Sequence, residues 1–146
     1  FDLLLGRKTY DIFASYWPHQ SDDDPGAAAL NKATKYVVTH NPDNLDWQES
    51  VHIAGDVAAE IKKLKAQDGP MLQVHGSSNL IQTLLANDLV DELWLKIFPV
   101  TLGKGKRLFG EGTIPAAFKL TGSKASPSGV IIASYKKGGE VQLGSF

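Results

Sequence analysis

The chain has 146 residues without cysteine, and its 15 lysines and arginines nearly balance its 16 aspartates and glutamates. This length fits one domain that buries about two thirds of its unfolded surface, and the lack of cysteine excludes disulfides, a thiolate zinc site and a cysteine nucleophile. Because the charges nearly cancel and no apolar run approaches the roughly 20 residues of a membrane span, we expect a soluble, cytoplasmic protein with no nucleic-acid or membrane partner.

The first predicted element is a short apolar strand at residues 3–5, which leads directly into Gly6-Arg7-Lys8-Thr9 where a helix begins. The free amides and partial positive charge at a helix N-terminus hold anions, and a glycine lets a phosphate approach the backbone. This junction is therefore a candidate phosphate site. An ordinary strand end with two solvated cations explains this segment equally well when it is taken alone.

Strands and helices then follow one another along the chain as far as residue 98, and they alternate except where two strands stand in succession between residues 36 and 54. The alternation predicts right-handed crossovers and a mainly parallel sheet, which binds ligands at the carboxyl ends of its strands. Gly6 and Gly76 both follow a predicted strand, so the turn Gly76-Ser77-Ser78-Asn79 is a second candidate anion site. The predicted strands are Tyr36–Thr39, Val51–Ala54, Met71–His75 and Glu92–Phe98, and the predicted helices are Ala27–Ala33, one between Asp56 and Asp68, and one that carries Leu80 to Leu85.

The C-terminal part of the sequence begins with a basic loop that contains Lys104, Lys106 and Arg107. It is no Walker loop, because Val100 stands where a glycine is required and Arg107 stands where a serine or threonine would reach magnesium. These cations are candidates for binding a substrate phosphate, and a mobile solvated loop is at least as good an explanation. The segments Phe118–Ala125 and Val130–Lys137 predict an antiparallel hairpin that closes one edge of the sheet.

Three motifs follow one another along the chain at intervals that fit one family. They are Leu4–Tyr10, Val74–Ile81, and Leu89–Leu93 followed by Pro99–Gly105 and Leu108-Phe109. With them the chain resembles the dihydrofolate reductase-like superfamily over nearly its whole length, and specifically the reductase (RibD C-terminal) domain of bifunctional riboflavin-biosynthesis enzymes. The resemblance implies a single domain over residues 1–146 with a three-layer α-β-α fold, a mixed, mostly parallel sheet and a C-terminal antiparallel hairpin.

The same resemblance implies NADPH as the cofactor. Arg7 and Lys8 would favour NADPH over NADH, because a 2′-phosphate attracts cations and a bare ribose does not. Lys96, Lys104 and Arg107 are weaker candidates for a substrate phosphate. By resemblance, the pyrophosphate and adenosine ribose are held by Gly6, Arg7, Lys8 and Thr9, the 2′-phosphate lies near Thr39, His40 and Asn41, and the other side of the pyrophosphate meets Gly76, Ser77, Ser78, Asn79 and Leu80.

The leading prediction is an NADPH-dependent reductase that passes hydride to a small heterocyclic or ribosylamino substrate, resembling 5-amino-6-(5-phosphoribosylamino)uracil reductase. True dihydrofolate reductase and a non-catalytic nucleotide-binding or assembly protein are the alternatives. The family normally begins with a central strand, a Leu-Asp-Gly-type loop and a helix that cover the nicotinamide. We therefore expect upstream residues to be missing and assign no catalytic residue.

Two further expectations concern metals and partners. The four histidines show no metal-ligand spacing, so no metal site is predicted. The number of aromatic residues, Trp94 and Phe98 among them, is larger than one hydrophobic core would cover. This excess is compatible with a homodimer.

Overall fold

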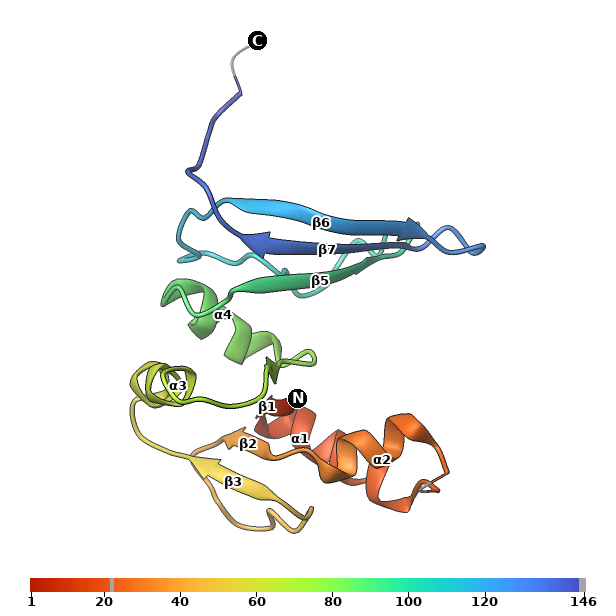
Figure 1. Cartoon of the computed structure of the whole chain (residues 1–146), viewed down its shortest axis with the longest axis vertical. Helices are drawn as coiled ribbons and strands as arrows, with labels where there is room; N and C mark the ends of the chain where they lie inside the picture. Colours follow the sequence, from red (N-terminus) through yellow and green to blue (C-terminus); the bar gives the residue numbers. More distant parts are fainter. Residues whose placement is uncertain (22, 145–146) are drawn as a thin grey trace. The chain divides into compact units, whose positions relative to one another are not determined.

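The computed structural model describes residues 1–21 and 23–144, and the chain divides into two compact units (Figure 1). The first unit runs from Phe1 to Thr83, and the second begins at Leu84. Helix α4 (Ser78–Ala86) crosses this boundary. The expectation of a single domain over residues 1–146 stays a prediction.

The first unit contains four parallel strands, which are β1 (Asp2–Gly6), β2 (Lys35–Val38), β3 (Ser50–Ile53) and β4 (Leu72–Gln73). They form one sheet in the spatial order β3-β2-β1-β4. Strand β1 is internal because β2 pairs with one side of it and β4 with the other. Leu3, Leu4 and Leu5 are all buried, as expected for a parallel strand that is covered on both faces and therefore carries a continuous apolar run.

Helices connect the strands of the first unit. They are α1 (Arg7–Ala14) after β1, the 3-10 helix η1 (Trp17–His19) and α2 (Pro25–Lys32) before β2, and α3 (Val57–Lys65) between β3 and β4. Tyr10 of α1 is buried in the core with Leu5 and Val37, and its ring centroid lies 6.1 Å from that of Trp47. This packing fixes the middle of α1, so the first turn of the helix stays at the end of β1. None of the helices in the described part of the chain is long and apolar enough to cross a membrane.

A lysine is buried inside the first unit. Lys35, at the start of β2, is 0% exposed. Its Nζ donates to the carbonyl oxygens of Asn31 at 2.5 Å and Gln48 at 3.1 Å, and it lies 4.3 Å from the ring centroid of Trp47. The two carbonyls and the indole face replace part of the hydration that the ammonium loses on burial.

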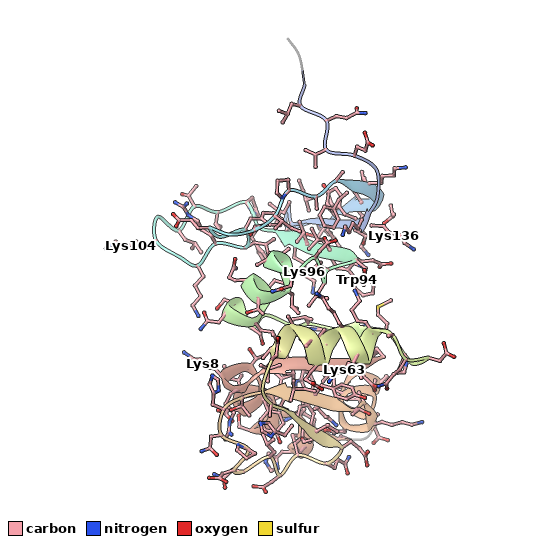
Figure 2. All side chains as sticks on the ribbon, turned by 90° about the vertical axis from the view of Figure 1, so that its left-hand side faces the viewer. Lys8, Lys63, Trp94, Lys96, Lys104 and Lys136 are labelled. Carbon is pink, nitrogen blue, oxygen red and sulfur yellow. The ribbon has the colours of Figure 1, made fainter. Side chains whose placement is uncertain are left out.

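The second unit contains an antiparallel sheet of β5 (Glu92–Ile97), β6 (Phe118–Ala125) and β7 (Ile131–Lys137). Strand β7 is central, in the order β5-β7-β6. Leu93 and Leu95 lie opposite Tyr135 and Ala133 on one face, whereas Trp94 on the other face is 60% exposed (Figure 2). Residues 98–117, between β5 and β6, contain no helix or strand.

The predicted fold class, a mixed α/β fold with a parallel sheet and a C-terminal antiparallel hairpin, is confirmed. Two pairings differ from the expectation. Strand Glu92–Ile97 runs antiparallel to β7 in the second sheet rather than continuing the parallel series, and the hairpin of β6 and β7 belongs to that second sheet and does not close an edge of the parallel one. Side-chain alternation identifies a strand and its two faces. The strand with which Glu92–Ile97 pairs depends on its register with residues 131–137, and the local alternation of side chains does not predict that register.

Candidate functional site

Two turns meet at the carboxyl ends of β1 and β4. Since these strands are parallel neighbours, Gly6 at the end of β1 and Gly76-Ser77 after β4 lie at the same edge of the sheet. The Gly6 N–H donates to Ser77 Oγ at 2.9 Å, and Ser77 Oγ donates to Thr9 Oγ1 at 2.9 Å. We call these two hydrogen bonds the Ser77 hydroxyl bridge. It joins residues that are 71 and 68 positions apart in the sequence and brings the two predicted anion-binding turns together.

The second turn has a left-handed backbone at two successive residues. The φ angle is +68° at Gly76 and +57° at Ser77. Glycine adopts this conformation freely, whereas for serine it costs about 1–2 kcal/mol, which the hydroxyl bridge helps to offset. A Cβ added at Gly6 would crowd Ser77 Oγ at 3.3 Å, so Gly6 lets the two turns approach each other. A Cβ added at Gly76 would project toward Thr9, 4.0 Å from its Oγ1.

Helices α1 and α4 both begin at these turns. Gly6 precedes α1 and provides no side-chain cap for the amides of its first turn, so these N–H groups can serve an external acceptor. Neither α1 nor α4 has an acidic residue in its first turn, whereas the first turn of α3 carries Glu60. The positive ends of both helix dipoles therefore lie at this edge of the sheet without a nearby carboxylate in the same turn. This arrangement suits a ligand with two linked phosphates.

The side chain of Arg7 turns toward the loop that follows β2. Its Nη1 donates to the carbonyl oxygens of Asn41 at 2.9 Å and Asp43 at 2.8 Å, and its Nε donates to Asp11 Oδ1 at 2.7 Å. Within the loop, the Asn41 N–H donates to Thr39 Oγ1 at 3.2 Å, and the Asp43 N–H donates to Asn41 Oδ1 at 2.8 Å. The loop predicted to lie near a 2′-phosphate is thus held against the first predicted turn.

The other predicted residues of the first unit differ in exposure. Lys8 is exposed and forms no ion pair with any residue in the described ranges (Figure 2). His40 and Asn79 are also exposed. Ser78 is partly buried at the start of α4, and Leu80 is buried.

The three weaker candidates belong to the second unit. Lys96 lies on β5, and Lys104 and Arg107 lie in the loop of residues 98–117. A part for them in a substrate site stays a prediction.

Sequence reasoning misses the residues that hold the site in place, which are Asp11, Asp43 and His52. Asp11 has a readable signal, because its spacing of four residues from Arg7 puts the two on one face of α1. No sequence signal marks His52. Its Nε2 donates at 2.8 Å to the carbonyl oxygen of Thr39, which lies 13 residues away in the loop that follows β2.

A separate depression of about 510 Å³ in the first unit is lined by none of the predicted site residues. Its buried polar groups bind one another. Asn31 Nδ2 donates to the carbonyl of Trp17, Asn31 Oδ1 accepts from Trp47 Nε1, and the Tyr10 hydroxyl accepts from the Trp47 N–H. Because these groups are already paired, we assign no ligand site there. Within residues 1–21 and 23–144, no three His, Cys, Asp or Glu residues gather as they would around a metal ion.

Comparison with known sequences relates the chain to one family. Residues 2–132 match the family model described as the RibD C-terminal domain. The chain is 32% identical over 136 residues to the uncharacterized protein YyaP of Bacillus subtilis (strain 168), an alignment that covers 91% of this chain and 72% of that protein. It is 28% identical over 125 residues to the uncharacterized protein YwjB of the same strain, covering 84% of this chain and 66% of that protein.

Two solved structures resemble the structure of this chain. A protein from Shewanella sp. PV-4, provisionally described as a riboflavin biosynthesis protein, has a TM-score of 0.71 and 26% identity, and the match covers 94% of this chain and 73% of that one. A pyrimidine reductase-like protein (DIP1392) from Corynebacterium diphtheriae has a TM-score of 0.65 and 14% identity, over 95% of this chain and 76% of that one, a likeness that bears on the fold alone. The dihydrofolate reductase-like fold predicted from the sequence is confirmed.

Proposed function

Because the chain belongs to the RibD C-terminal domain family, we propose that it is an NADPH-dependent reductase that acts on a small heterocyclic or ribosylamino substrate. The observation that carries this proposal is the Ser77 hydroxyl bridge. It holds together two turns at one sheet edge, and each turn leads into a helix whose first turn carries no acidic residue. The riboflavin-biosynthesis description of the Shewanella protein supports the same substrate class.

The residues at this edge fit a phosphorylated dinucleotide. A Cβ added at Gly76 would enter a space next to Thr9. This space lies between the two turns that would hold the pyrophosphate. The turn at Gly6–Thr9 and the turn at Gly76–Leu80 supply backbone amides, which bind phosphate oxygens without a side-chain cation. Arg7 binds the carbonyl oxygens of Asn41 and Asp43, and this contact supports a role for the loop at residues 39–41 beside the adenosine 2′-phosphate. When bound, NADPH supplies the hydride, and the chain orients it.

We propose Lys96, Lys104 and Arg107 as contacts of a substrate phosphate, since each adds a cation to the second unit. The cytoplasmic location and the homodimer stay predictions.

Fluorescence titration with NADPH and NADH tests the cofactor proposal. We expect NADPH to bind at least tenfold more tightly than NADH, because a 2′-phosphate adds charge-assisted hydrogen bonds. A chain that binds neither dinucleotide would overturn the proposal. Loss of the nicotinamide absorbance is then followed with 5-amino-6-(5-phosphoribosylamino)uracil and with dihydrofolate. Binding without oxidation in either mixture would favour a non-catalytic nucleotide-binding protein.

Two glycine substitutions test the location of the site. Gly76→Ala and Gly55→Ala impose similar backbone strain, since φ is +68° and +73°, but a Cβ at Gly55 meets no atom within 4 Å. We expect both variants to lose about 1–2 kcal/mol of stability, and only Gly76→Ala to weaken NADPH binding, by about tenfold or more. Isothermal titration and chemical denaturation measure the two effects. Equal affinities in the two variants would place the cofactor elsewhere.

A further inference from the structure

We infer that Arg7 governs cofactor selectivity as a positioning residue: it fixes the loop at residues 39–43 and does not itself supply the cation that meets the 2′-phosphate. This inference rests on the proposed function, because it names how the same site distinguishes NADPH from NADH. Arginine beside a phosphate site would ordinarily be taken as a direct ligand. Its contacts in this chain assign it another role.

The guanidinium of Arg7 has already used the donors that a phosphate would need. Its Nε donates to Asp11 Oδ1 at 2.7 Å, and its Nη1 donates to two carbonyl oxygens at 2.9 and 2.8 Å. A guanidinium has five N–H donors, and every two-nitrogen fork onto a phosphate includes either Nε or Nη1. Only Nη2 is left, so a bidentate phosphate contact would require breaking at least one of the three observed hydrogen bonds. The Asp11 carboxylate also offsets the charge of Arg7 at this position.

The two carbonyls that Arg7 binds belong to an exposed loop with a defined internal structure. Asn41 and Asp43 are both exposed, so little packing holds them. Inside the loop, Thr39 Oγ1 accepts from the Asn41 N–H and Asn41 Oδ1 accepts from the Asp43 N–H. On the sheet side, His52 Nε2 donates to the carbonyl of Thr39 at 2.8 Å. Arg7 and His52 thus fix the loop from two directions, and the contact from Arg7 ties it to the first turn of α1.

Lys8 provides the matched comparison. It is the next residue in the same helical turn, its side chain is exposed, and no ion pair within the described part of the chain engages it (Figure 2). A lysine ammonium binds phosphate as a point charge without a required fork geometry. Of the two neighbouring cations, Lys8 is therefore the one free to meet a phosphate, and Arg7 is the one that shapes the loop.

The experiment compares Arg7→Met, Arg7→Lys and Lys8→Met with the unmodified chain, using dissociation constants for NADPH and NADH at low and high salt. We expect Arg7→Met to lower the NADPH preference by about tenfold, and Arg7→Lys to restore none of it, since a single ammonium nitrogen cannot occupy the separate positions of Nε and Nη1 from which the guanidinium serves its three acceptors. The salt dependence of NADPH binding should stay nearly unchanged in Arg7→Met, because Asp11 already offsets the charge of Arg7. It should become shallower in Lys8→Met, because ions screen the attraction between the exposed Lys8 ammonium and a phosphate. Rescue by Arg7→Lys, or a shallower salt dependence in Arg7→Met, would overturn the inference.

A second measurement separates this inference from the proposed function. Hydrogen exchange of the Asn41 and Asp43 amides is recorded without any dinucleotide, and exchange should be faster in Arg7→Met than in the unmodified chain or in Lys8→Met. Unchanged exchange in Arg7→Met overturns the positioning role even if NADPH binds. If the unmodified chain binds neither dinucleotide, the proposed function fails, and faster exchange in Arg7→Met still supports Arg7 as the residue that holds the loop.

Discussion

At the scale of single residues, the buried Lys35 links the stability of the chain to pH. Burial lowers the pKa of Lys35 from 10.5 to about 8, against the opposing effect of the carboxylates of Glu49 and Asp2. The unfolded chain therefore binds this proton more tightly than the folded chain does between those two pH values. As a result, the contribution of Lys35 to the free energy of unfolding is greatest above pH 10.5, decreases as the pH falls toward 8, and is constant below that.

Replacing Lys35 by methionine should remove this dependence. Between pH 7.5 and 9.5 we expect the free energy of unfolding of the unmodified chain to rise by about 2 kcal/mol more than that of Lys35→Met. Urea denaturation at the two pH values measures the difference, and the variant is the control for every other group that titrates in this range. Parallel pH profiles for the two chains would show that Lys35 keeps an ordinary pKa in the folded state.

At the scale of elements, the start of α2 is stabilised by one carboxylate. Asp24 Oδ1 accepts from the amides of Gly26 at 2.8 Å and Ala27 at 3.3 Å. Asp24→Ala should cost about 1 kcal/mol, the usual value for loss of an N-cap. Asp23→Ala is the control, because the Asp23 carboxylate contacts Ser21 Oγ at 3.4 Å and, among the described contacts, no amide of α2. We expect it to change stability by less than about 0.5 kcal/mol, and equal losses in denaturant would contradict the assignment of the cap.

The sequence predicts the extents of most elements but not every neighbour. Strand Phe118–Ala125 has the predicted bounds, and the predicted strand Tyr36–Thr39 is shifted by one residue. The predicted helix Ala27–Ala33 starts at Pro25 instead, because an aspartate followed by proline is a helix start as well as a loop signal. The partner of Glu92–Ile97 was not predictable, because pairing with β7 depends on a register set by distant residues.

The candidate site was predictable in its turns and not in its contacts. Gly6 and Gly76 are visible in the sequence because each ends a predicted strand and begins a helix. The role of Arg7 is not visible, since its acceptors are backbone carbonyls 34 and 36 residues away, and a carbonyl carries no residue-specific signal. The Ser77 hydroxyl bridge is hidden by its sequence separation, because its acceptor Thr9 and its donor Gly6 lie 68 and 71 residues away from Ser77.

At the scale of the whole molecule, the long loop at residues 98–117 should be the first point of proteolytic attack. It contains no helix or strand, and Lys104, Lys106 and Arg107 within it are exposed. Trypsin requires an extended, accessible segment, whereas Lys62 and Lys63 are held in α3. Limited digestion followed by mass spectrometry should therefore show the earliest cleavage between residues 104 and 107. Earliest cleavage within α3 would mean that the helix opens more readily than the loop.

The tryptophans are divided unequally between the two units, with Trp17 and Trp47 in the first and Trp94 in the second. Trp47 is 4% exposed and Trp94 is 60% exposed. Emission from Trp47 will therefore shift to longer wavelength when its surroundings become aqueous, whereas Trp94 is largely in water from the start. Comparing the chain with a Trp94→Phe variant isolates the emission of each unit. The molecule thus carries in Trp47 an optical reporter of the first unit, and comparing its transition with the loss of total secondary structure asks whether the two units unfold in one cooperative transition or in two.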